Sequence, residues 1–120
     1  QMIIITHHIH HKKIAEIGDN LIILRNEDDG IQLVGEIYYA GYDALIMYEH
    51  QFTPDFWDLK NRLAGAILQK FTNYKIQLAI IGNFTAVQSA SLRDFIRESN
   101  KRKQINFANS LADALELFYN

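Results

Sequence analysis

Residues 43–84 read DALIMYEHQFTPDFWDLKNRLAGAILQKFTNYKIQLAIIGNF, and this stretch decides the fold. It contains two short apolar runs, Ala44–Tyr48 and Ile76–Ile81, each bounded by polar or turn residues. Such runs are typical of strands buried on both faces, which are usually parallel and central in a sheet. The residues between them predict a helix from Pro54 to about Phe71, so the unit is a right-handed strand–helix–strand crossover.

A strong helix-start pattern opens this central helix. Thr53 is a candidate N-cap, Pro54 suits the first helical position, and Asp55 faces the positive end of the helix dipole. Gly65 lies in mid-helix, where glycine costs about 1 kcal/mol. We therefore expect Gly65 to allow close approach of another backbone, either that of the sheet or that of a second subunit.

Alternating patterns precede the central unit. Met2–Ile9 and Lys13–Ile17 alternate between apolar and polar residues and predict a hairpin with its turn at His10–Lys12. Leu21–Leu24 is ambiguous, since it is either a third small strand or an extended lead-in. Asn26 or Asp28 can then cap a helix over residues 29–40, which Gly41 ends.

The remaining residues predict two further helices and one strand. Ser91 is a candidate cap for a helix over Leu92–Ser99, Ile105–Ala108 reads as a strand, and Ser110 caps a final helix. The whole pattern predicts a single α/β domain covering residues 1–120. Its mixed sheet of four or five strands combines the N-terminal hairpin with parallel βαβ units, and about four helices flank it.

Composition excludes several classes of protein. The 48% hydrophobic and 22% charged fractions are those of an ordinary soluble globule. No run approaches the length of a membrane span and no signal peptide opens the chain, so we expect a cytoplasmic protein with no membrane partner. A net charge of −2 argues against a nucleic-acid partner. There is no cysteine and no glycine-rich phosphate loop, and we expect no cofactor.

Several motifs carry a family resemblance. They are Phe52–Leu59, Leu63–Gly65, Leu68–Phe71, Lys75–Phe84 and Ser91–Asn100. Through these motifs nearly the whole chain resembles a bacterial family of uncharacterised proteins, domain of unknown function 4180. The resemblance implies family membership and no particular activity.

The order of elements is also similar to that of STAS domains, the fold of anti-sigma-factor antagonists. That resemblance implies a non-enzymatic protein that binds partners and is switched by phosphorylation at the start of the helix after a central strand. Thr53 occupies this kind of position. The STAS turn usually reads Asp-Ser-Ser/Thr-Gly-Leu, whereas Gln51-Phe52-Thr53-Pro54 stands here, so the resemblance carries the fold further than the switch.

Both central strands lead into polar residues. Glu49, His50 and Thr53 follow the first strand, and Asn83 and Thr85 follow the second. Ligands of open α/β sheets bind beyond the carboxyl ends of the strands, near helix N-termini that attract anions. A carboxylate beside an imidazole also suits acid–base chemistry. These residues predict a site for a small anion or metabolite, with weak enzymatic activity as one form of it, or else they only satisfy turn amides.

The segment His7–His11 offers four imidazoles, the commonest protein ligands of zinc, nickel and copper. Alternation places His8 and His10 on one face of a strand, which makes them weak candidates for metal ligands. A third ligand would have to come from elsewhere, so an exposed hairpin tip that binds no metal is the favoured interpretation.

Some residues suggest a surface for other proteins. Trp57 would mark such a surface if it were exposed, and Arg93 and Arg97 lie on a charged helix face that is either a partner patch or simply solvated. We also expect self-association into a homodimer through exposed aromatic residues, with five candidates: Tyr38, Tyr39, Tyr42, Trp57 and Tyr119.

Three functional hypotheses follow. The favoured one is a small non-enzymatic regulatory or protein-interaction domain of STAS-like type, with an unidentified protein partner and with Thr53 as the switch. The second is an anion or metabolite binder, or weak enzyme, at Glu49, His50 and Asn83. The third is metal binding by the His7–His11 segment.

Overall fold

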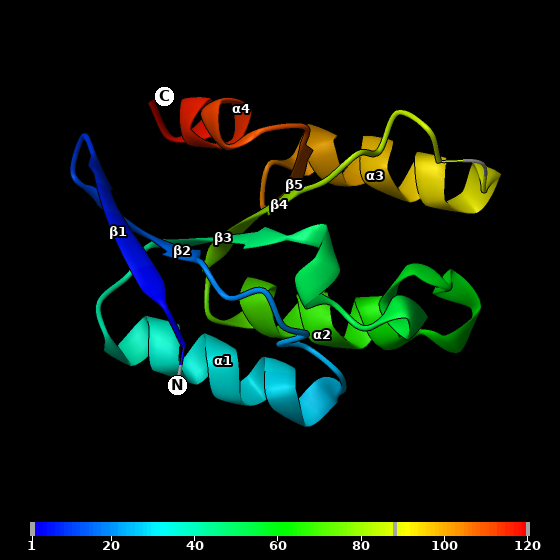
Figure 1. The fold of residues 1–120 in the computed structure, drawn as a ribbon, viewed down its shortest axis with the longest axis horizontal. Coiled ribbons are helices and arrows are strands. Elements are labelled where there is room, and N and C mark those ends of the chain that lie inside the picture. Colours follow the sequence, from blue (N-terminus) through cyan, green and yellow to red (C-terminus); the bar gives the residue numbers. More distant parts are fainter. Residues whose placement is uncertain (1, 88, 120) are drawn as a thin grey trace.

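The computed structural model describes residues 2–87 and 89–119, which form a three-layer α/β domain around one mixed sheet (Figure 1). Five strands lie in the sheet in the order in which they occur in the chain: β1 (Ile4–Ile9), β2 (Lys12–Ile17), β3 (Ala44–Tyr48), β4 (Gln77–Ile81) and β5 (Ile105–Ala108). Strand β1 pairs antiparallel with β2, and the other neighbours are parallel. The predicted mixed sheet with its N-terminal hairpin is confirmed.

Four helices cover the sheet: α1 (Glu27–Tyr39), α2 (Leu63–Asn73), α3 (Ala90–Arg102) and α4 (Leu111–Glu116). Because consecutive parallel strands are neighbours and their crossovers are right-handed, α1, α2 and α3 all lie on one face. The short helix α4 packs on the other face. Figure 1 shows α1 and α2 side by side beneath the sheet and α4 above it. No helix in the described ranges is long and apolar enough to cross a membrane.

Each face of the sheet has its own apolar core. The larger core joins the sheet to the three long helices and contains Met47, Ile67 and Phe71. The smaller core lies under α4, where Ile46 and Phe118 are fully buried. The alternation of side chains along β2–β5 supplies both cores, which is why these strands read as continuous apolar runs.

The prediction of one helix from Pro54 to Phe71 is wrong. Two short 3₁₀ turns, Pro54–Trp57 and Leu59–Asn61, come first, and α2 begins only at Leu63 after Arg62 with φ of 65°. Side chains compete with the backbone in this segment. Asp58 accepts a hydrogen bond from the Lys60 amide at 3.3 Å, and Asn61 donates to the Asp55 carbonyl at 2.7 Å.

Helix caps follow the sequence with one correction. Asn26 accepts a hydrogen bond from the Asp29 amide at 2.9 Å and begins α1, and Gly41, with φ of 83°, follows its end. Ser110 caps α4 as predicted. The cap of α3 is Ser89 rather than Ser91, because the extended backbone that an N-cap requires lies at Ser89.

The ambiguous Leu21–Leu24 segment does not form a strand of the sheet. Leu24 alone makes a single parallel bridge, to Phe52, and its side chain is completely buried. The segment is the extended lead-in that the sequence left open as one of two possibilities.

One buried amide joins this lead-in to the sheet. The fully buried side chain of Gln51 donates to the carbonyls of Ile17 at 2.9 Å and Asp19 at 2.8 Å. Its carbonyl oxygen accepts a hydrogen bond from the Tyr48 amide at 2.8 Å. The backbone carbonyl of Gln51 accepts from the amides of Ile23 and Leu24. Gln51 therefore holds together the ends of β2 and β3 and the loop that leads to α1.

We predict that Gln51→Leu destabilises the protein by about 3 kcal/mol or more, because it removes three hydrogen bonds and leaves the buried Ile17 carbonyl and the half-buried Asp19 and Tyr48 backbone groups without this partner. Urea unfolding measures the effect. Gln32→Leu on the exposed face of α1 is the control, with an expected change within about 0.5 kcal/mol. Equal stability of the two variants would contradict the structural role of Gln51.

Candidate functional site

The residues predicted at the carboxyl ends of the central strands do come together. The Glu49 Oε1 atom accepts a hydrogen bond from the Asn83 amide at 3.2 Å, and the Thr85 hydroxyl donates to Asn83 Oδ1 at 2.8 Å. A methyl group added at Gly82 would lie 2.6 Å from Glu49 Oε1, so the carboxylate fills the space over the end of β4. A ligand site at Glu49, Asn83 and Thr85 stays a prediction.

His50 and Thr53 have local roles at this edge. The His50 ring stacks on Tyr48 with ring centroids 5.8 Å apart, and its Nε2 atom lies 3.4 Å from the Asp19 carbonyl oxygen. The Thr53 amide donates to the Leu24 carbonyl at 2.9 Å, but its hydroxyl makes no capping bond. Thr53 does stand at an N-cap position ahead of Pro54, but the element that follows is a 3₁₀ turn rather than the long helix, and the expected side-chain capping bond is absent. A switch at Thr53 stays a prediction, although the long helix that it was expected to begin is not there.

A polar network beside this edge was not predicted from the sequence. Glu16 on β2 is only 6% exposed, and its two carboxylate oxygens have separate partners. The His7 Nε2 atom lies 2.8 Å from Oε1, and the Tyr48 hydroxyl donates to Oε2 at 2.7 Å. The network links β1, β2 and β3 on the face that carries α4. The sequence does contain a sign of this network, because the alternation of side chains along β2 places Glu16 on the same face as buried Ile14.

The environment of Tyr48 favours its neutral form. Burial, the hydrogen bond to Glu16 and the negative charge of that carboxylate together raise the pKa of Tyr48 to about 12. The corresponding stabilisation is present below the unfolded pKa of about 10. It is lost as the pH rises through 10 toward 12, where the phenol ionises in the folded state.

We predict that Tyr48→Phe lowers the free energy of unfolding by about 1–2 kcal/mol at neutral pH, because Glu16 loses a hydrogen-bond donor. The variant should also lose less stability than the wild type between pH 10 and 12. Urea unfolding across that range measures both effects. Parallel pH profiles for the two proteins would contradict the assignment.

The histidine segment does not assemble a metal centre in the described residues. His8 lies on β1, whereas His10 occupies the turn with φ of 55° and packs its ring edge-on against Tyr119. Among the residues that the structure places, no group of three or more His, Cys, Asp and Glu side chains could hold a metal ion.

Trp57 is not exposed, and a partner surface that includes it stays a prediction. It is half-buried in an aromatic cluster, with ring centroids 4.8 Å from Phe56, 5.6 Å from Phe84 and 6.2 Å from Phe107. The two 3₁₀ turns that replace the start of the predicted helix carry Trp57 into this cluster. Its role is therefore to pack the loops against β5.

The helical face carries an apolar hollow of about 330 Å³ between α2 and α3. We call it the α2–α3 groove; its lining includes Gly65, Leu68, Phe95, Arg102 and Ile105. Gly65 is exposed, and nothing lies within 4 Å of the position that its Cβ would occupy. The expectation that Gly65 lets the sheet approach is wrong, because Gly65 faces away from the sheet. The alternative, contact with another subunit, is untested.

Helix α3 is unusually little covered for a helix of 13 residues. Of its residues, Leu92 alone is buried. Arg93 and Arg97 are exposed, and with Phe84, Ile96 and Lys101 they line a second hollow of about 550 Å³ on the other side of the helix from the groove. Arg97 pairs with Asp94 at 2.8 Å, and Arg93 donates to the Val87 carbonyl at 3.0 Å.

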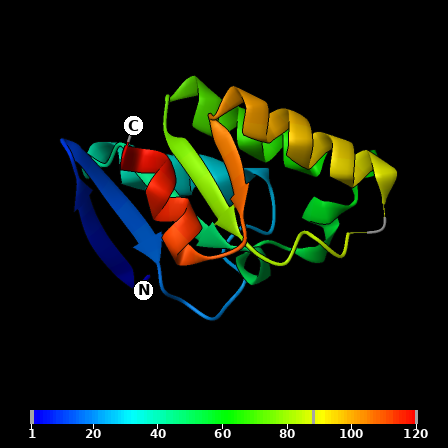
Figure 2. The same cartoon turned by 90° about the horizontal axis from the view of Figure 1, so that it is seen from above.

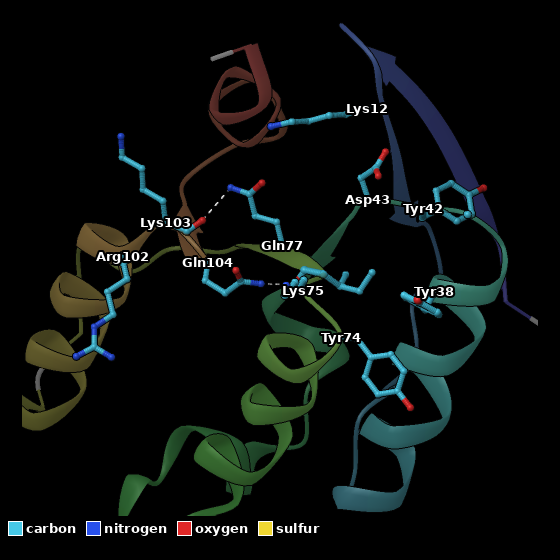
Figure 3. A pocket seen from close by; sticks show the side chains of 12 residues that line it. Lys12, Tyr38, Tyr42, Asp43, Tyr74, Lys75, Gln77, Arg102, Lys103 and Gln104 are labelled. Carbon is cyan, nitrogen blue, oxygen red and sulfur yellow. Dashed lines mark hydrogen bonds between the residues drawn. The ribbon is translucent and has the colours of Figure 1, made fainter.

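A third hollow, of about 580 Å³, lies at the amino-terminal ends of the strands (Figure 3). Its lining includes Lys75 and Lys103, both with left-handed backbones, at the ends of α2 and α3. Figure 3 shows Gln77 and Gln104 between them, donating at 2.8 Å to the carbonyls of Lys103 and Ile76. Cations beside helix C-termini stabilise the helix dipoles, which accounts for these lysines.

Arg102 borders both this basic hollow and the α2–α3 groove. The region from α3 to Lys103 carries five cationic residues against two acidic ones, although the chain as a whole has a net charge of −2. The described surface around α3 therefore combines apolar hollows with concentrated positive charge.

Comparison with known proteins places the chain in a family. A family model described as a domain of unknown function, DUF4180, matches residues 9–117. The chain belongs to this family. No curated protein and no solved structure matches the DUF4180 chain. The resemblance drawn from the sequence motifs is thus confirmed, and it brings no activity with it.

Only part of these sites could be predicted from the sequence. The mid-helix Gly65 was a visible signal for the α2–α3 groove. An exposed glycine lowers the stability of a helix and packs against nothing within the chain, which suggests a role in contact with another molecule. The groove itself depends on how far apart α2 and α3 pack. Apolar residues of α3 such as Phe95 look the same in sequence whether they are covered or line a hollow.

Proposed function

We propose that the DUF4180 chain is a small non-enzymatic protein-interaction domain that binds a partner segment along the α2–α3 groove. The observation that carries the proposal is the open space over Gly65 within an apolar groove. A helix–helix groove lined by an exposed glycine suits a partner that inserts an apolar side chain and brings its backbone close. The similarity of element order to STAS domains supports the same class of function.

The apolar walls define what enters the groove. Leu68 comes from α2 and Phe95 from α3, and Ile105 of β5 lines the same groove. Phe95 is only half-buried, so a partner side chain would remove part of its ring from water. Burial of an aliphatic or aromatic anchor in such a hollow contributes roughly 1.5–3 kcal/mol.

Charge defines the rest of the partner segment. Arg102 lies at the end of the groove that adjoins the basic hollow with Lys75 and Lys103. In the described part of the chain, none of the ion pairs involves these three side chains. Acidic residues flanking the apolar anchor would complement them, which favours orientation and association rate more than affinity. The partner is therefore an acidic protein segment with one apolar anchor.

The test uses two helical glycines, half-buried Gly35 and exposed Gly65, that both have open space at Cβ. Gly65 on α2 and Gly35 on α1 both lie inside helices, and at both an added Cβ meets nothing within 4 Å. Of the two, Gly65 lines the α2–α3 groove. Gly65→Leu fills the groove and Gly35→Leu does not, while both variants remove the same helix-weakening residue.

We predict that a protein captured by the wild type and by Gly35→Leu is captured at least about tenfold less by Gly65→Leu and by Arg102→Gln, a factor that corresponds to about 1.4 kcal/mol. Quantitative mass spectrometry of affinity captures identifies it, and titration of the purified pair measures the dissociation constants. Equal affinity for Gly65→Leu and the wild type would overturn the proposed groove.

A stability measurement checks the open space independently. We predict that Gly65→Ala raises the free energy of unfolding by about 0.5–1 kcal/mol, because alanine loses less conformational entropy in a helix and meets no atom here. Thermal and urea unfolding measure the change, with Gly35→Ala as the matched control. A loss of stability in Gly65→Ala alone would show that the space above Gly65 is already filled.

A further inference from the structure

Strand β1 is an edge strand without the usual protection. Figures 1 and 2 both show it as the outermost strand of the sheet. The apolar side chains at its start are exposed: 58% for Ile3, 38% for Ile4 and 44% for Ile5. The strand has six residues in unbroken register with β2, so it contains no bulge, and it carries no proline, lysine or acidic residue. Natural proteins usually place such features on a free edge to prevent pairing with another chain.

The opposite edge of the sheet is protected. Strand β5 has only four residues, and Asn100 of α3 lies against its outer side. The Asn100 Oδ1 atom accepts a hydrogen bond from the Phe107 amide at 2.7 Å, and its Nδ2 atom lies 3.5 Å from the Phe107 carbonyl oxygen. The molecule therefore covers one edge and leaves the other open.

The register of the hairpin shows which backbone groups of β1 are free. The Gly18 amide donates to the Ile3 carbonyl at 2.8 Å, so residues 3, 5, 7 and 9 direct their backbone groups toward β2. The alternate residues Ile4, Thr6 and His8 then direct theirs outward. Among the described residues, no hydrogen bond involves these six outward groups.

These outward groups are self-complementary. Two copies of β1 can pair antiparallel about a two-fold axis at Thr6, which places Thr6 opposite Thr6 and Ile4 opposite His8. All three outward residues of each copy then form hydrogen-bonded pairs. Each such pair in an antiparallel ladder exchanges two backbone hydrogen bonds, so the three pairs give six bonds between the copies. Registers centred on Ile4 or His8 leave some outward groups unpaired.

Side chains agree with this register. On the face that carries α4, exposed Ile5 comes opposite His7 of the second copy, and Ile3 comes opposite Ile9. On the other face the threonines meet at the axis, and no pair brings two like charges of acidic or lysine side chains together. The pairing would cover the apolar start of β1 in both copies.

We propose that the β1 edge binds a second copy of this chain, so that two sheets join into one continuous sheet across a two-fold axis at Thr6. The partner is a second copy because the outward backbone donors and acceptors of Ile4, Thr6 and His8 can all pair with the same groups of another β1 about an axis at Thr6. The surface is distinct from the α2–α3 groove. Of the aromatic residues from which self-association is expected on sequence grounds, Tyr38 and Tyr39 are exposed on α1 away from β1, whereas the hydroxyl of Tyr42 lies 2.6 Å from the Thr6 hydroxyl.

The test exploits the meeting of Thr6 with itself. Thr6→Lys and Thr6→Glu each place like charges directly opposite in the dimer, whereas Thr6 is exposed in the single chain. Thr6→Val is the matched control, because it keeps the β-branched shape and loses only the hydroxyl that lies 2.6 Å from the Tyr42 hydroxyl. Circular dichroism and thermal unfolding confirm that every variant is folded.

Sedimentation velocity of the whole chain over a concentration series measures the oligomeric state. We expect dimers for the wild type and Thr6→Val, self-association weaker by roughly tenfold or more for Thr6→Lys and Thr6→Glu, and a heterodimer in their equimolar mixture. A monomeric wild type at its highest soluble concentration would overturn the proposal. So would a dimer that Thr6→Lys leaves intact, or a mixture of the two charged variants that stays monomeric.

Discussion

The order of strands in the sheet is the constraint on which the rest of this structure depends. Each parallel strand lies beside the one before it in the chain, and right-handed crossovers then place α1, α2 and α3 on the same face. The other face receives only the short helix α4. This arrangement leaves α3 at the margin of the helical layer with one buried residue, and it leaves the hairpin strand β1 as an open edge.

The carboxyl ends of the strands, where many α/β proteins bind ligands, are occupied here by the protein's own side chains. Gln51 bonds three backbone groups, and Glu49 lies over Gly82 and accepts the Asn83 amide. Buried polar groups of this kind stabilise a structure only when each has a partner. In the described residues, no buried side-chain nitrogen or oxygen lacks one. The hollows described above lie instead on the helical face and at the amino-terminal ends of the strands, and the open edge of the sheet is β1.

Much of the fold was predictable because its signals are local. Apolar runs identified β3 and β5 with their observed bounds, and Asn26 and Ser110 act as the expected caps. The long central helix was predicted wrongly because Asp58 and Asn61 bond nearby backbone groups and Trp57 packs into an aromatic cluster. The helical spacing of apolar residues does not reveal these side-chain contacts, so it predicted an α-helix where none forms. The predicted site residues were near one another, yet the groove at Gly65 required the spacing of two helices.

The sequence by itself determined the α/β class, the mixed sheet, the family and the candidate residues at the strand ends. Periodicity, capping residues and turn residues act over a few neighbouring positions, so they can be recognised directly in the sequence. Tertiary structure alone decided that Glu16 meets His7 and Tyr48, that Gly65 lines a groove, and that the backbone groups of Thr6 face outward from an open edge. These outcomes depend on register and on helix spacing, which are set by contacts between residues far apart in the chain.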